Sequence, residues 1–115
     1  MRIIFNNKVS EKQFSSRYKN KWKYPKIVSI KLQSIENFIT SARSLADIAA
    51  YSPYHFHKLV GDRDGEWAIY VGNTGYRVTL IPCDDDGNEL VSGDIMAQCK
   101  MIKIVMVTGV SNHYE

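Results

Sequence analysis

The chain has 115 residues, a mass of 13.2 kDa and a formal net charge of +3, which suits one domain built around one hydrophobic core. Its 44% hydrophobic and 23% charged residues are ordinary for a globular protein, and no apolar run reaches the roughly 20 residues that a membrane-spanning helix needs. The first residues, Met1 to Asn6, turn polar too early for a secretory signal, so we expect a cytoplasmic protein.

The N-terminal quarter predicts a strand followed by a helix. Residues 2–6 have the character of a short strand. Ser10 and Gln13 then stand at capping-box spacing, which predicts a helix over about 10–19. Lys19 to Lys23 forms a basic connector behind it.

A second helix is predicted from Pro25, a residue that suits a first helical turn. Four apolar residues follow at the spacing of one buried helical stripe, namely Val28, Leu32, Ile35 and Ile39. Lys26 and Lys31 can then face solvent. Ser44, with Asp47 three residues later, is expected to cap a brief third helix that ends near Ala50.

After Gly61 the apolar residues alternate with other residues, as in strands, instead of recurring at helical spacing. Trp67 to Val71 and Tyr76 to Ile81 read as two strands, and the four residues 72–75 as the hairpin connection between them. Pro82 is expected to end the second strand, because proline cannot donate a hydrogen bond to the ladder.

The segment from Cys83 to Cys99 is expected to be a long excursion. Residues 84–88 superficially resemble a calcium loop, but the glutamate expected at the twelfth position is Met96, so we interpret them as a turn. No second Cys/His pair stands at zinc-finger spacing, and two free thiols are the simplest reading of the cysteines.

The final strand is expected over Met101 to Val107, followed by a polar and aromatic tail. Helices therefore come first and strands later, which indicates an α+β fold with an antiparallel sheet. Charge follows the same division. Residues 1–60 carry eleven Lys and Arg against three Asp and Glu, and residues 61–115 carry four against nine. The basic half suits RNA or an acidic protein as a partner. A lysine-rich helix surface that is simply solvated would explain the same charge equally well.

The residues most suited to chemistry surround the hairpin. His57, Lys58 and Arg63 precede it, Arg77 lies on its second strand, and His113 and Tyr114 could fold back from the C-terminus. Such a set suits RNA cleavage. The 2′-hydroxyl nucleophile is already held beside its phosphate. The protein must add a base, an acid and fixed positive charge, and a metal is not required.

Each of these residues also has an ordinary structural interpretation. His57 could simply pack on the hairpin, and Arg77 could pair across it with Glu66 or Asp64. Exposed lysines and arginines are most often solvated, and chain ends often fray. Spacing alone leaves both interpretations open.

Three segments of the sequence are similar to motifs of a known protein family. Residues 57–69 read HKLVGDRDGEWAI, similar to the H-x-L-K-G-D-R-x-G-x-W-S-I stretch of the RelE/HigB-type toxins of bacterial toxin–antitoxin systems. Residues 75–78, GYRV, resemble its x-[WY]-R-[IV] element, and residues 112–114, NHY, resemble its terminal aromatic–histidine signature. Residues 1–55 agree with the family in layout rather than by motif.

The resemblance implies that residues 1–115 form one toxin domain, a helical hairpin packed on a small twisted antiparallel sheet. It implies an mRNA endonuclease that enters the ribosomal A site and is neutralised by a cognate antitoxin. We expect neither a cofactor nor a metal, and no membrane partner. His57 would be catalytic, Arg77 would steady the phosphate, and His113 with Tyr114 would help transfer protons. We expect RNA contacts from the cations Lys58, Arg63, Lys23, Lys26 and Lys31.

Three departures from the family pattern bear on this assignment. Val60 replaces the lysine of the L-K-G element, and Lys58 or Arg63 would have to supply its charge from a different position. The terminal pair is His-Tyr, where relatives often have Tyr-His, so the acid and base roles could be exchanged. The acidic excursion over 83–99 exceeds the family minimum, and we expect it to point away from a phosphate site.

Two further functions remain open on the same fold. One is a non-catalytic toxin of the ParE kind that binds a protein such as DNA gyrase. The other is an RNA- or ribosome-binding relative that has lost activity, for which Val60 is the best argument. A pure binder has no chemical need for the full set His57, Arg77, His113 and Tyr114.

Overall fold

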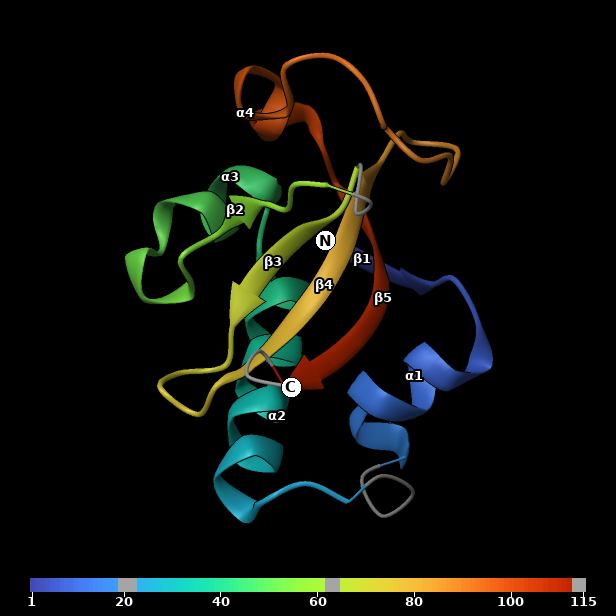
Figure 1. Cartoon of the computed structure of the whole chain (residues 1–115). Coiled ribbons are helices and arrows are strands. Elements are labelled where there is room, and N and C mark those ends of the chain that lie inside the picture. Colours follow the sequence, from blue (N-terminus) through green and yellow to red (C-terminus); the bar gives the residue numbers. More distant parts are fainter. Residues whose placement is uncertain (19–22, 62–64, 113–115) are drawn as a thin grey trace.

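The computed structural model describes residues 1–18, 23–61 and 65–112 (Figure 1). The helices are α1 (Lys8–Phe14), α2 (Lys26–Ser41), α3 (Leu45–Ala50) and α4 (Ile95–Gln98). The strands are β1 (Arg2–Phe5), β2 (His57–Lys58), β3 (Trp67–Tyr70), β4 (Tyr76–Cys83) and β5 (Ile104–Asn112). Short 3₁₀ turns occupy Ser16–Tyr18, Ser52–Tyr54 and Cys99–Met101.

The described strands form one mixed sheet in the order β1-β5-β4-β3-β2. The α+β class expected from the sequence is confirmed, but the wholly antiparallel sheet is wrong. β1 pairs with β5 in parallel, whereas β5, β4, β3 and β2 pair in antiparallel fashion. Local pattern could not reveal this, because the first strand of the chain takes its place beside the last one.

The second helix follows its predicted stripe. Val28, Leu32, Ile35 and Ile39 are all buried on α2, which crosses one face of the sheet (Figure 1). They join buried sheet residues such as Ile69 and Val107 in a single hydrophobic cluster. Within the described part of the chain, no helix is long and apolar enough to cross a bilayer.

The first helix begins earlier than predicted. α1 starts at Lys8, and Asn7 caps it by accepting a hydrogen bond from the Ser10 N–H at 2.9 Å. Ser10 instead donates its hydroxyl to the Thr108 carbonyl at 2.9 Å, and Gln13 accepts from the Val110 N–H at 3.0 Å. Both side chains thus hydrogen-bond backbone groups of β5 beyond the last residue paired with β1. These bonds protect a strand edge that would otherwise be open.

Strands β4 and β5 are longer than predicted. Pro82 does not end β4, which continues to Cys83. The Pro82 carbonyl accepts from Leu90 N–H at 2.9 Å on the side away from β5, so its missing N–H removes no bond of the β4–β5 ladder. β5 runs to Asn112 rather than ending at Val107, because residues 109–112 pair with the first half of β4.

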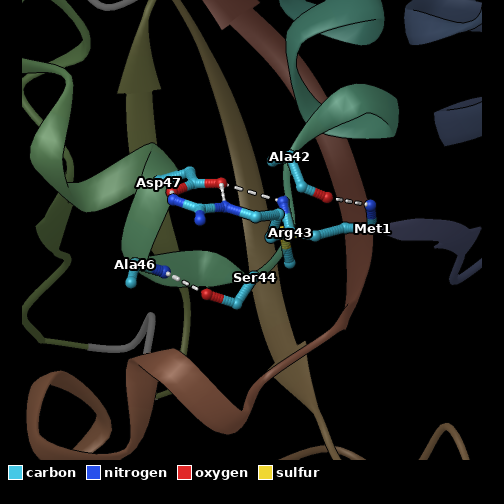
Figure 2. Close-up of polar contacts among 6 residues, drawn as sticks. All are labelled: Met1, Ala42, Arg43, Ser44, Ala46 and Asp47. Atoms are coloured by element: carbon cyan, nitrogen blue, oxygen red, sulfur yellow. Dashed lines mark hydrogen bonds and ion pairs between the residues drawn. The ribbon is translucent and has the colours of Figure 1, made fainter.

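A compact polar junction joins α2, α3 and the chain start (Figure 2). The Met1 ammonium donates to the Ala42 carbonyl at 2.6 Å and to the Ile39 carbonyl at 3.2 Å, at the C-terminal end of α2. Ser44 caps α3, as predicted. Hydrogen bonds from the Arg43 side chain and backbone to Asp47 lower the pKa of that carboxyl. The junction ties the chain start to the end of α2.

Candidate functional site

The two faces of the sheet differ in character. Directly paired residues share a face, so the register places Trp67 with Leu80 and Ile69 with Val78 on the buried face beneath α2. The opposite face carries His57, Ala68, Tyr70, Arg77 and Thr79 from β2, β3 and β4, with Ser111 from β5. We call this second set the site face.

His57 and Arg77 therefore lie on the same face. His57 pairs with Ala68, two residues before Tyr70, and Tyr70 pairs with Arg77. Two strand spacings and two residues along the strand separate the His57 and Arg77 Cα atoms by roughly 12 Å. The Tyr70 ring meets the His57 ring edge-on, with 5.4 Å between centroids.

Arg77 carries an unsatisfied donor. Its side chain is half-buried, and its Nε atom is buried with no hydrogen-bond partner in the described part of the chain. Leaving a buried donor on a charged group without an acceptor is unfavourable, and such groups are rare. The alternative pairing with Glu66 is not found, since Tyr70 and Ser111 are the residues opposite Arg77; Asp64 lies outside the described residues.

A β-bulge builds the polar floor of the site face. Thr79 pairs with Gly109 and Leu80 with Val107, so Thr108 is the extra residue on β5. Bulges re-aim side chains and are frequent beside active sites. The Thr108 hydroxyl donates to Glu66 Oε1 at 2.6 Å and lies 2.8 Å from the Thr79 hydroxyl. The Glu66 carboxylate is thus hydrogen-bonded to the bulge residue Thr108.

The remaining candidate cations are dispersed. Lys58 pairs with Trp67 and so stands on the opposite side of β2 from His57. Lys23 is exposed and lines a hollow of about 290 Å³ that also includes Ser111, the residue paired with Arg77. Lys26 is exposed on the first turn of α2. Lys31 lies against the hairpin turn, where a Cβ on Gly72 would come within 2.8 Å of its side chain.

Three predicted site residues, Arg63, His113 and Tyr114, lie outside the described residues. Val60, which stands where the RelE/HigB-type motif has a lysine, is 85% exposed. The sequence interpretation did not single out Tyr70 for the site. The four-residue connection that it did predict fixes the register that brings Tyr70 opposite Arg77. Extending the hairpin by one further pair would have found this tyrosine.

The acidic excursion leaves β4 at Cys83, the end opposite Arg77. It begins with the predicted turn, in which the Asp84 carboxylate accepts from the N–H groups of Asp86 and Asn88, both at 2.9 Å. Both cysteines are free, and burial raises the pKa of the Cys83 thiol, with Glu89 and Asp84 adding to the effect. In this turn the Asp84 carboxylate is bound to backbone N–H groups of the loop itself.

A scan against protein-family models finds no match to the chain, and a search of curated proteins finds none either. Function must therefore be inferred from the residues of the site face and from the motifs quoted from the sequence.

Proposed function

We propose that the chain is an endoribonuclease of the RelE/HigB kind, the toxin of a toxin–antitoxin pair, which cleaves messenger RNA on the ribosome without a metal. The observation that carries the proposal is the strand register, which places the half-buried Arg77 on the same sheet face as His57. A phosphodiester group is a suitable partner for the Arg77 guanidinium, because guanidinium groups hold phosphate with fixed charge and directed hydrogen bonds.

The proposed reaction uses the 2′-hydroxyl of the RNA as nucleophile. His57 removes the proton from that hydroxyl, and the 2′-oxygen attacks the adjacent phosphorus while the bond to the 5′-oxygen breaks. Arg77 stabilises the negative charge that grows on the phosphate oxygens. The leaving 5′-oxygen needs a proton, and the family resemblance assigns this step to His113 or Tyr114.

The strand register is compatible with this arrangement. A separation of roughly 12 Å between the Cα atoms of His57 and Arg77 suits two side chains that converge from either side on a phosphate above Tyr70. Glu66 accepts a hydrogen bond from Thr108, which directs that oxygen towards the sheet.

The finer features implied by the resemblance belong to the same proposal. They are the helical hairpin of the RelE/ParE-like fold, a cytoplasmic location, entry into the ribosomal A site and neutralisation by a cognate antitoxin. The mixed α+β sheet with α2 on one face is compatible with that layout.

The test is induced expression followed by mapping of mRNA 5′ ends, comparing wild type with Arg77→Ala. We expect the variant to lose cleavage and growth arrest by about 100-fold or more, as when a group that stabilises transition-state charge is removed. Arg43→Ala removes an exposed arginine that is not part of the site face and is the control that should keep activity.

Circular dichroism should show that Arg77→Ala folds normally. Cleavage by Arg77→Ala within a few-fold of wild type would refute the proposed role of this arginine. Growth arrest by wild type without new mRNA ends would refute the ribonuclease and favour a non-catalytic toxin of the ParE kind.

A further inference from the structure

His55 has an unusual backbone conformation. Among the described residues it is the one non-glycine with positive φ, at φ 47° and ψ 44°. It follows the 3₁₀ turn Ser52–Tyr54, and its own N–H donates to the Ser52 carbonyl at 3.1 Å. Left-handed backbone outside glycine is uncommon and is found where surrounding structure or function requires it.

This conformation brings the His55 carbonyl next to the His57 ring. The His55 carbonyl oxygen lies 2.6 Å from Nδ1 of the His57 ring. A carbonyl can only accept a hydrogen bond, so Nδ1 must carry a proton. In a neutral imidazole the other nitrogen, Nε2, then holds the lone pair and is the atom able to accept a proton.

Contacts with the Tyr70 ring also hold His55 and His57 in place. The His55 ring stacks on the Tyr70 ring, with 5.3 Å between centroids and 27° between planes. Tyr70 in turn meets the His57 ring at 79°. The backbone of His55 and the ring of Tyr70 thus fix both the tautomer and the plane of His57.

We infer that His55 is a positioning residue for His57, whose left-handed backbone aims its carbonyl at Nδ1 so that Nε2 serves as the proton acceptor. The claim about the tautomer stands on geometry alone. Its consequence for RNA cleavage rests on the proposed function. The two claims can therefore fail separately.

The test compares two substitutions that both remove the His55 ring. Asparagine tolerates the left-handed region and should keep the carbonyl in place, whereas β-branched valine does not. Imidazole ¹⁵N chemical shifts of the full chain report the tautomer of His57. We expect the Nδ1–H form in wild type and in His55→Asn, and a mixture of both tautomers in His55→Val.

Cleavage assays on programmed ribosomes should follow the spectra. We expect kcat of His55→Asn to stay within about threefold of wild type and that of His55→Val to fall about tenfold with little change in KM, a partial loss of general-base catalysis. A purely structural role would affect both variants alike. Should valine prevent folding, His55→Ala takes its place in both measurements.

An Nε2–H tautomer in wild type would overturn the inference, whatever the protein does to RNA. Equal spectra for His55→Asn and His55→Val would refute the role of the His55 backbone. A wild-type protein that shows the Nδ1–H tautomer but cleaves no RNA would refute the proposed function and leave the positioning role of His55 standing.

Discussion

Individual side chains of the site face are held by neighbours from several elements. Tyr70 on β3 contacts two histidines from the segment before it and pairs with Arg77 on β4. Because the Tyr70 ring touches His57 and the Tyr70 backbone pairs with Arg77, the distance between His57 and Arg77 depends on the hairpin register. A register shift of one residue would move every one of these side chains to the other face.

Behind the site, Tyr54 gives the protein a defined response to alkaline pH. Burial raises the pKa of Tyr54 from 10.0 to about 12, and the Tyr51 phenol adds to the effect. The folded state therefore favours the neutral phenol. The resulting stabilisation is fully present below pH 10.0 and is lost as pH rises towards about 12.

We accordingly expect the free energy of unfolding to decrease above pH 10.0, by less than about 1.4 kcal/mol per pH unit for this one proton. Denaturant unfolding at several pH values measures it, and Tyr54→Phe should show a weaker decrease than wild type. Unfolding at neutral pH controls for the folding of the variant. The same slope for both proteins would exclude Tyr54 as the titrating group.

At the scale of elements, features set by local pattern were predictable and features set by distant partners were not. The stripe from Val28 to Ile39 predicted α2, because a 3.6-residue period is a property of one segment. The hairpin followed from its four-residue connection in the same way. By contrast, Ser10 and Gln13 looked like a capping box, but the edge of β5 engages both side chains.

The length of β5 shows the same limit. Residues 109–112 look like a polar tail because their partners lie 30 to 36 residues earlier, on β4. The bulge at Thr108, and with it the contact to Glu66, exists only once β4 and β5 are paired. For the site, the sequence pointed to His57 and Arg77, and the strand register places both on one face. The unusual backbone of His55 and the role of Tyr70 needed the three-dimensional arrangement.

For the molecule as a whole, the site face and the basic first half suggest how a large RNA would be engaged. Lys23 lines the hollow next to the C-terminal end of β5, and Lys26 is exposed on the first turn of α2. Lys31 is a poorer candidate for charge reversal, because its side chain packs on the hairpin turn. We therefore expect Lys23 and Lys26 to contact ribosomal RNA.

Replacing both lysines by glutamate should weaken co-sedimentation with ribosomes at low salt. The difference should shrink as salt rises, because binding to phosphate releases counterions, and the salt slope should become shallower by about 1 for each phosphate that is no longer bound. Lys100→Glu with Lys103→Glu makes the same change in charge at exposed positions of the acidic half and is the control. If both double variants bind alike, the start of α2 is not part of the interface.

The most direct test of the central claim, attack by the RNA's own 2′-hydroxyl beside Arg77 and His57, alters the substrate and leaves the protein unchanged. An mRNA carrying a single 2′-O-methyl group at the mapped cleavage position is placed on ribosomes and incubated with the wild-type protein. We expect cleavage at that position to disappear while other positions are cut as before. Continued cleavage at the methylated nucleotide would contradict the proposed mechanism, because no 2′-hydroxyl would remain there for His57 to activate.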